Sequence, residues 1–196
     1  ISPSVRKARN FIQHVSDVRA RIEPWGHHGT MAHIAASAAS ARLPNDIHAQ
    51  LDMDRVGATL YGHRSHEGED ITLLREAMVV SAPVATVIER SVGDTVGYGS
   101  THRLQNGETH TANLAAGWLH MPRSLSNRGF IANRKGQRFR MLGAVSMNTT
   151  VLNADDEADG LNLLRDGEMV FLLGAPGPSA EEMAKLIDLP PSYLSL

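Results

Sequence analysis

Ten histidines are the residues of this sequence best suited to bind a metal ion, because a neutral imidazole is a common metal ligand. Their spacing does not form a ligand set. His27 and His28 are adjacent, and His63 and His66 stand in a polar segment with no Asp or Glu at a spacing that would orient them. The chain has no cysteine, which excludes a thiolate site and a cysteine nucleophile. The sequence therefore predicts no metal site.

Motifs for nucleophilic catalysis or phosphate binding are also missing from the sequence. It contains no G-x-S-x-G elbow, no H-E-x-x-H helix and no Walker loop. Lysine could act as an amine nucleophile, but Lys7, Lys135 and Lys185 fall on an opening helix, in a turn and on a closing helix, where we expect solvent. The four acids within residues 155–159 indicate a solvated loop rather than a cation site.

Three longer segments carry more information: GDTVGYGST at residues 93–101, PRSLSNRG at 122–129 and GAVSMNTT at 143–150. In this order and at these separations they resemble the signature segments of the C-terminal β-domain of alanine racemases. Upstream, HIAASAA at residues 33–39 resembles the H-x-A-N-S-A segment of that family, and MDRVGATLYG at 53–62 resembles its V-R-x-G-I-x-L-Y-G segment. The SMNTT string, together with TANL at 111–114, is closer to the broad-specificity amino-acid racemase branch.

The resemblance implies a fold in two parts. The family has an N-terminal (β/α)8 barrel that holds pyridoxal phosphate and a β-domain that completes the active site of the other subunit in a head-to-tail dimer. Residues 1–66 resemble the last units of the barrel and residues 67–196 the β-domain, so the fold class is α/β followed by mostly β. Because most of the barrel is missing, we expect a homodimer or a partner chain that carries the rest. A start at Ile1 without Met indicates a processed product or one member of a split protein.

The resemblance also assigns residues to the cofactor and the substrate. Arg55 matches the arginine that hydrogen-bonds the pyridine nitrogen, with a surface or ion-paired arginine as the alternative. Phosphate-contacting positions match Ser37, Gly57 and Ala58, and Tyr193 is a candidate for the phosphate-binding tyrosine of the family's closing segment. Met147 and Asn148 match residues on the substrate side, where many alanine racemases have aspartate in place of Asn148.

Racemisation requires acids or bases on both faces of the substrate Cα. None of the three lysines resembles the Schiff-base lysine of the family. The second base of the family is a tyrosine in a G-Y-[AS]-D-G segment, and residues 117–121 here are one residue shorter and place Trp118 at the tyrosine position. An indole cannot take a proton from carbon. His120, the only titratable side chain nearby, is the remaining candidate base, with an ordinary loop histidine as the alternative.

The elements that must position these residues follow from hydrophobic periodicity. Apolar residues three and four apart predict a helix over residues 4–21, an apolar run predicts a buried strand over 29–35, and Ala-rich sequence predicts a short helix over 36–43. Residues 53–62 are typical of a strand and turn. A capping box at Ser179 begins a last helix, which Pro190 ends. Between glycine turn signals, β-branched segments predict strands over residues 79–89, 95–98, 111–118, 129–133, 138–154 with an interruption, and 168–173.

Composition excludes several classes of protein. Nineteen Lys and Arg against 21 Asp and Glu give a net charge of −2, which leaves no basic field to hold nucleic acid or an anionic membrane. The sequence has no apolar run of ~18 residues that could span a bilayer and no secretory signal pattern. We therefore expect a globular cytoplasmic protein, or a periplasmic one if it is of the broad-specificity branch.

Two functions remain open. The first is the C-terminal part of a pyridoxal-phosphate-dependent racemase that interconverts L- and D-amino acids, with a small amino acid as substrate and the Schiff-base lysine outside this chain, which is then inactive alone. The second is a diverged, non-catalytic homologue that acts in dimerisation or ligand binding. Arg55 favours the first function, and Trp118 favours the second.

Overall fold

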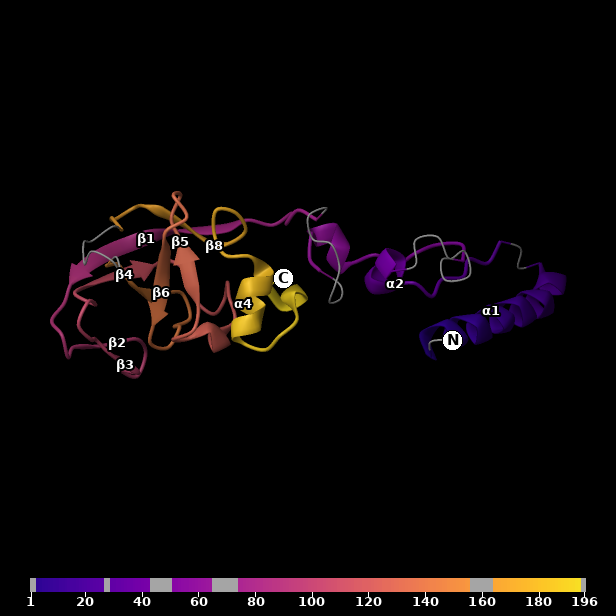
Figure 1. Ribbon diagram of the computed structural model, residues 1–196, viewed down its shortest axis with the longest axis horizontal. Helices are drawn as coiled ribbons and strands as arrows, with labels where there is room; N and C mark the ends of the chain where they lie inside the picture. The colour runs from indigo at the N-terminus through magenta and orange to yellow at the C-terminus, as the bar shows by residue number, and fades with distance from the viewer. Residues whose placement is uncertain (1–2, 27–28, 43–50, 65–73, 156–163, 195–196) are drawn as a thin grey trace. The chain divides into compact units, whose positions relative to one another are not determined.

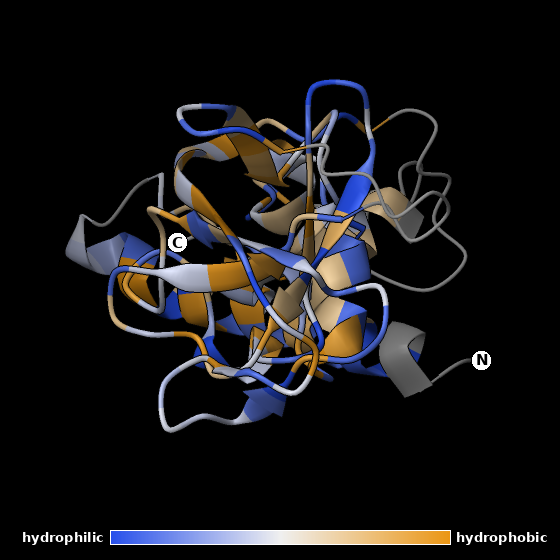
Figure 2. Cartoon of the chain, turned by 90° about the vertical axis from the view of Figure 1, so that its left-hand side faces the viewer, coloured by the Kyte–Doolittle hydropathy of each residue, from blue (hydrophilic) through white to orange (hydrophobic). Residues whose placement is uncertain are grey.

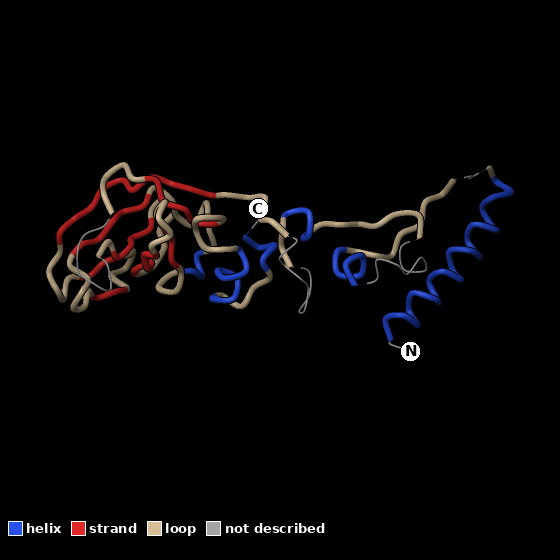
Figure 3. The backbone as a smooth tube through the Cα atoms, turned by 45° about the horizontal axis from the view of Figure 1, so that its top comes forward, coloured by secondary structure: helices blue, strands red, loops and turns tan. Residues whose placement is uncertain are grey.

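The computed structural model describes residues 3–26, 29–42, 51–64, 74–155 and 164–194. The chain divides into two compact units, residues 1–75 and 76–196, and each is described by itself. Helices and loops make up the described part of the first unit, whereas the strands belong to the second (Figure 3). The boundary expected between residues 66 and 67 lies outside the described residues.

The first unit begins with α1 (Pro3–Ile22), which the 3-10 turn η1 (Glu23–Trp25) continues (Figure 1). The predicted helix is therefore confirmed. Its half-buried positions recur three and four residues apart, as an amphipathic helix requires: Ala8, Ile12, Val15, Arg19 and Ile22. No described side chain of α1 is fully buried.

Arg19 fastens α1 to the chain that follows it. Its guanidinium donates to the Thr30 carbonyl oxygen at 2.7 Å and forms an ion pair with the Asp52 carboxylate. That carboxylate also accepts the Ala32 N–H at 2.7 Å. The Ala32 hydrogen bond, followed by the bond from Arg19, lowers the pKa of Asp52. Because the side chains of Arg19 and Asp52 are 43% and 39% exposed, solvent screens the pair, and it positions residues 30–32 more than it stabilises the fold.

The buried strand predicted over residues 29–35 is wrong. The segment carries no strand and is mostly exposed, with only Ala35 buried. The next residue, Ala36, forms one parallel bridge with Arg55. The described part of this unit holds no neighbouring strand that could extend this bridge into a ladder. The predicted helix is confirmed as α2 (Ser37–Arg42), while residues 53–62 end in the 3-10 turn η2 (Ala58–Tyr61) rather than a strand.

The second unit is a closed, antiparallel β-barrel. A separate two-stranded sheet pairs β2 (Thr95–Val96) with β3 (His102–Arg103). A single register pair, Ala132 with Phe171, joins β5 to β8. Around the barrel the order is β1 (Val80–Glu89), β4 (His110–Leu114), β7 (Thr150–Asn153), β6 (Arg138–Leu142), β5 (Phe130–Ala132) and β8 (Met169–Leu173), which returns to β1.

The strands predicted in this unit are confirmed with shorter bounds, and β3 is an addition. The strand predicted over 111–118 ends at Leu114, and the one over 95–98 ends at Val96. The interruption expected within 138–154 separates β6 from β7. Sequence did not predict β3, which is only two residues long.

Apolar side chains of the strands fill the barrel, because alternate residues of a strand face one side. Val84, Leu114, Met141, Leu152 and Leu172 are all at most 2% exposed and belong to one core. Hydrophobic colours gather on these strands, while the connecting loops are largely hydrophilic (Figure 2).

A short helix, α4 (Ala180–Leu186), packs on this core through Met183. Its predicted capping box is confirmed: the Glu182 N–H donates to the Ser179 hydroxyl, and the Glu182 carboxylate accepts the Ser179 N–H, both at 3.1 Å. The 3-10 turn η5 (Pro191–Leu194) follows. None of the described helices is long and apolar enough to cross a membrane.

Two glycines bring signature segments into contact. Gly97 and Gly143 have φ of 81° and 72°, in the left-handed region that favours glycine. A Cβ on Gly97 would lie 2.8 Å from the Ala144 nitrogen, and one on Gly143 would lie 2.8 Å from the Val96 oxygen. Both positions therefore require glycine, which links residues 93–101 to residues 143–150.

Candidate functional site

Four of the predicted cofactor-binding residues lie next to one another in the first unit. The Arg55 N–H donates to the Ala35 carbonyl oxygen at 2.9 Å, beside the Ala36–Arg55 bridge. Just beyond the bridge, the Gly57 N–H donates to the Ser37 Oγ at 2.9 Å, and Ala58 begins η2. The structure thus brings together two segments that are separated in the chain and that carry Arg55, Ser37, Gly57 and Ala58.

This cluster carries hydrogen-bond donors. Ser37 is 8% exposed, and because its oxygen accepts the Gly57 N–H, its own hydroxyl proton is available for another acceptor. No atom lies within 4 Å of the place a Cβ of Gly57 would take, so the backbone is open there. The Arg55 side chain is exposed. A hydroxyl and a guanidinium are groups that hold phosphate and other acceptors.

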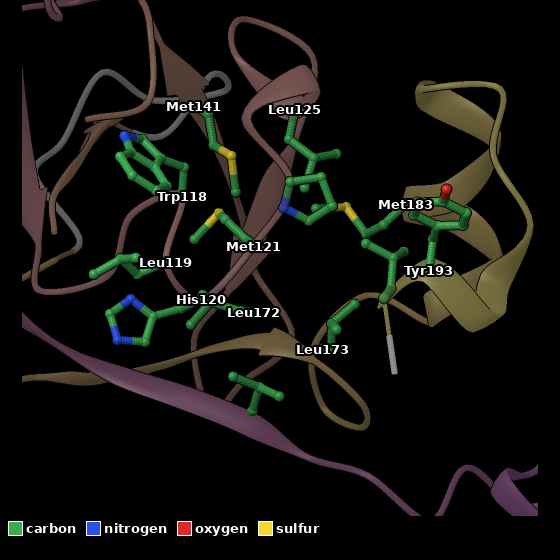
Figure 4. A pocket seen from close by; sticks show the side chains of 13 residues that line it. Trp118, Leu119, His120, Met121, Leu125, Met141, Leu172, Leu173, Met183 and Tyr193 are labelled. Atoms are coloured by element: carbon green, nitrogen blue, oxygen red, sulfur yellow. The ribbon is translucent and has the colours of Figure 1, made fainter. Parts of the chain in front are cut away.

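A second group of predicted residues lines a cavity of about 510 Å³ in the second unit. Trp118, Leu119 and His120 lie on one side of the cavity, and Met183 and Tyr193 on the opposite side (Figure 4). The side chains between them include Met121, Leu125 and Met141. Tyr193 is therefore brought to one cavity with Trp118 and His120, which lie more than 70 residues earlier in the sequence.

Backbone hydrogen bonds hold the loop that carries Trp118 and His120. The Trp118 N–H donates to the Ser146 carbonyl oxygen at 2.9 Å, and the Leu119 N–H donates to that of Met147 at 3.3 Å. A Cβ on Gly117 would lie 2.2 Å from the Ser146 oxygen. Only glycine fits at residue 117, and the loop is fixed against residues 146–147.

His120 closes the same loop on itself. Its backbone N–H donates to the Gly117 carbonyl oxygen at 2.8 Å, and the Gly117 N–H donates to its ring Nδ1 at 3.3 Å. The His120 side chain is exposed, and Trp118 is 44% exposed. Neither side chain is shut away from solvent, so both are accessible to a ligand.

The predicted substrate residues lie beside this cavity rather than on its wall. Met147 and Asn148 are exposed, and the Met147 carbonyl oxygen contacts the loop through Leu119. The Val145 N–H donates to the Ser126 Oγ at 3.0 Å and the Gly143 N–H to the Asn127 Oδ1 at 2.6 Å, which places the 122–127 loop next to residues 143–145. The functional roles of these residues stay predictions.

Several polar residues are more buried than their sequence context indicates. Asp155, predicted in a solvated loop, is 3% exposed, and its Oδ1 lies 2.8 Å from the His110 Nδ1. Glu108 is equally buried, with its Oε2 2.8 Å from the His102 Nε2. His63, predicted in a polar segment, is 3% exposed and stacks on the Tyr61 ring. No local pattern reveals such burial, because it depends on residues elsewhere in the chain.

The lysines and the metal-ligating residue types remain to be placed. Lys7, Lys135 and Lys185 are all exposed. Within the described residues, no group of three or more His, Asp or Glu side chains is placed to hold a metal ion.

Comparison with known families gives a match over most of the second unit. Residues 77–193 match the family described as "Alanine racemase, C-terminal domain". The alanine racemase of Nitratidesulfovibrio vulgaris is 34% identical over 166 residues, which are 82% of this chain and 41% of that protein. The broad specificity amino-acid racemase of Pseudomonas taetrolens is 31% identical over 160 residues, or 80% and 36%. The chain therefore spans less than half the length of these relatives.

Solved structures give the same result for the fold. The alanine racemase of a D-cycloserine-producing Streptomyces lavendulae superposes with a TM-score of 0.80 at 28% identity and covers 98% of this chain and 49% of its own. The Bartonella henselae alanine racemase, which carries covalently bound pyridoxal phosphate, superposes with a TM-score of 0.72 at 22% identity. These matches confirm the resemblance that the five sequence segments indicated.

Proposed function

Because the chain belongs to the alanine racemase C-terminal domain family, we propose that it is the C-terminal portion of a pyridoxal-phosphate-dependent racemase that interconverts L- and D-amino acids. The lysine that binds the cofactor is supplied outside these 196 residues, since Lys7, Lys135 and Lys185 are surface residues. The broad-specificity relative supports a substrate range wider than alanine.

The observation that carries this proposal is the joining of Ser37 to Gly57 beside the Ala36–Arg55 bridge. Ser37 has a hydroxyl proton to donate, and the backbone at Gly57 is open, as a phosphate group would need. A guanidinium is a hydrogen-bond donor and a very weak acid, so the Arg55 side chain can donate to a pyridine nitrogen without protonating it fully. These residues fit the phosphate and the ring nitrogen of pyridoxal phosphate, which when bound supplies an electron sink for the Cα carbanion.

Two further features support the placement of residues 1–66 at the end of a (β/α)8 barrel. The Ala36–Arg55 bridge is parallel, and parallel pairing of neighbouring strands is the rule in such a barrel. The half-buried stripe of α1 lacks a fully buried side chain in its described part, so it has room for a further packing partner. We propose that the missing barrel units, carried outside these 196 residues, cover it.

The β-domain carries the positions that match the second base and the substrate-side residues of the family. Trp118 stands where the family has its tyrosine base, and Met147 and Asn148 stand on the substrate side. An indole has no lone pair basic enough to take the Cα proton, so this chain lacks a recognisable second base as well as the lysine. Purified chain mixed with pyridoxal phosphate and L-alanine should give no D-alanine above the free-cofactor background in a chiral assay.

Cofactor binding is tested without relying on activity. Pyridoxine 5′-phosphate keeps the phosphate and ring nitrogen but has no aldehyde, so it cannot react with the three lysines. Ser37→Ala and Arg55→Ala should each weaken its binding to the full chain by about tenfold in equilibrium dialysis, as loss of one charge-assisted hydrogen bond predicts. Ser40→Ala, which removes another α2 hydroxyl whose bond goes to the Ala36 oxygen, is the matched control. Equal affinities in all three variants would contradict the proposed site.

The second candidate function, a non-catalytic homologue, is favoured by Trp118 itself. A chain that keeps the fold while losing the phenol could still dimerise or bind a ligand. Under this alternative, Ser37→Ala would leave ligand binding and association unchanged. A complex with lysine-bearing barrel units would also remain inactive after a tyrosine is restored at residue 118.

A further inference from the structure

The cavity of the β-domain is mostly apolar. Its volume of about 510 Å³ lies within the range of roughly 300 to 1,000 Å³ typical of small-molecule sites. Apart from Trp118, His120 and Tyr193, every residue that lines it is aliphatic, a thioether or proline. Deep wall residues such as Leu125, Met141 and Met183 are at most 1% exposed. Unbranched methionine side chains adapt readily to a ligand, so this wall suits a flexible hydrocarbon chain.

The three side chains with polar atoms lie where the cavity meets solvent. Trp118 and Tyr193 are 44% and 58% exposed, and His120 is exposed too. Trp118 and His120 come from one loop, and Tyr193 lies on the opposite side (Figure 4). A ligand that fills the apolar part can therefore keep a polar head at this mouth, in contact with water, without the cost of burying a charge.

The hydrogen bond inside the loop decides what His120 offers at the mouth. The Gly117 N–H donates to Nδ1, so Nδ1 acts as the acceptor. In a neutral imidazole one nitrogen accepts and the other carries the proton, so the proton of His120 resides on Nε2. The Nε2–H is then the hydrogen-bond group that the ring of His120, a residue lining the cavity, offers a ligand, rather than a basic lone pair. The fixed loop, which Gly117 and the bonds to residues 146–147 hold in place, keeps that donor at the rim.

We propose that this cavity binds an aliphatic monocarboxylate, with the hydrocarbon chain against the methionine and leucine wall and a carboxylate oxygen accepting the Nε2–H of His120. The donor matches a carboxylate acceptor, and the apolar wall matches a chain of several methylenes. Such binding needs neither pyridoxal phosphate nor a racemase reaction, so it stands or falls separately from the proposed function.

Fluorescence of Trp118 provides a direct test in the full chain. The protein has two tryptophans, and Trp25 is 80% exposed, so Trp25→Phe leaves Trp118 as the only indole with little effect on stability. Titration with acetate, butanoate, hexanoate and octanoate should give a saturable change. Affinity should rise by up to about fourfold per added methylene, as burial of hydrocarbon predicts. An unsaturable change, or equal affinity for acetate and octanoate, would overturn the proposal.

Three variants in the Trp25→Phe background distinguish the contribution of the ligand's carboxylate from that of its hydrocarbon chain. His120→Leu should weaken octanoate binding by about tenfold or more, because the carboxylate loses its donor. His120→Gln, which keeps an N–H donor, should restore most of the affinity. His33→Leu, an exposed histidine of the first unit, should change nothing. Equal octanoate affinity in the parent and His120→Leu would overturn the role of His120, as would nitrogen NMR that placed the neutral ring proton on Nδ1.

Discussion

At Gly117 the absence of a side chain decides where Trp118 and His120 lie. A Cβ there would approach the Ser146 oxygen to 2.2 Å, and that oxygen already accepts the Trp118 N–H. Gly117→Ala should therefore lower the free energy of unfolding of the β-domain by more than about 2 kcal/mol, because backbone rather than a flexible side chain must move. Urea titration followed by Trp118 fluorescence measures the loss.

Gly136→Ala is the control for this substitution. Gly136 has φ of 79°, but no atom lies within 4 Å of the place that an added methyl group would take. Alanine there costs only the left-handed backbone strain of about 1 kcal/mol. An equal loss in the two variants would show that crowding at Gly117 is unimportant.

Trp118 decides between a working and a decayed racemase site. In a complex with lysine-bearing barrel units that bind the cofactor, Trp118→Tyr should raise racemisation, because general acid or base groups contribute about 10²- to 10⁴-fold. The sequence predicts a loop one residue shorter than in the family, and a misplacement of about 1 Å can cost about 10²-fold, so we expect a gain near the lower end. A chiral assay with Trp25→Tyr as control measures it. A loss on His120→Ala without a gain from Trp118→Tyr would instead make His120 the base.

The sequence predicted which hydrogen-bond donors lie together, but it did not predict which acidic residues are buried. Ser37, Gly57 and Arg55 were predicted from matching segments, and the structure brings them together because those segments are neighbours. Burial of Asp155 could not be predicted, since its carboxylate is enclosed by Thr109 and His110, which lie about 45 residues earlier. The antiparallel pairing of β4 with β7 creates that contact.

At the scale of elements, α4 carries a pH-dependent contribution to stability through its capping box. Partial burial alone would raise the pKa of Glu182, but the Ser179 N–H and then the Arg138 guanidinium outweigh it, and the pKa is lowered from 4.5. A carboxyl whose pKa is lower in the folded state stabilises the fold above its unfolded pKa, and this contribution is lost as the pH falls through the lowered value. Because the Glu182 side chain is 42% exposed, solvent keeps the effect small.

Glu182→Gln tests this contribution. The variant should be less stable than the parent at about pH 7, and the difference should shrink as the pH falls through the lowered pKa of Glu182, below which the parent carboxyl is also protonated. Urea denaturation at several pH values measures the difference. Glu181→Gln removes a charge from the same turn without touching the capping box, and a pH dependence identical to that of Glu182→Gln would contradict the assignment.

Elements with a long pattern were predictable from sequence, and elements that depend on a distant partner were not. The first six residues of β1 alternate between more buried and exposed positions, and Ser179 with Glu182 marks the start of α4. The apolar run over residues 29–35 is typical of a strand, but a strand requires a neighbour, and the described chain supplies one bridge at Arg55. The two-residue β3 is too short to have any period.

At the scale of the molecule, the two units differ in the number of apolar side chains that they bury. The large buried apolar side chains belong to the second unit, whereas Ala35 is the one buried apolar residue in the described part of the first. We therefore expect two unfolding transitions rather than one, with the first unit melting at lower urea. Trp25 reports the first unit and Trp118 the second, so Trp118→Phe and Trp25→Phe isolate the two signals. Coincident transitions in the two variants would contradict this expectation.

The single register pair between β5 and β8 makes this strand pairing the weakest point of the barrel on heating. The other strand pairings of the barrel have two or more register pairs, so the β5–β8 seam is where thermal opening begins, and amide deuterium exchange at Ala132 and Phe171 should be faster than at Ala112 or Leu152. An open seam exposes two raw strand edges, which are templates for pairing between molecules. The closed barrel therefore prevents strand pairing between molecules only while β5 and β8 remain paired. Gentle heating should produce aggregates joined through these strand edges before the domain itself unfolds.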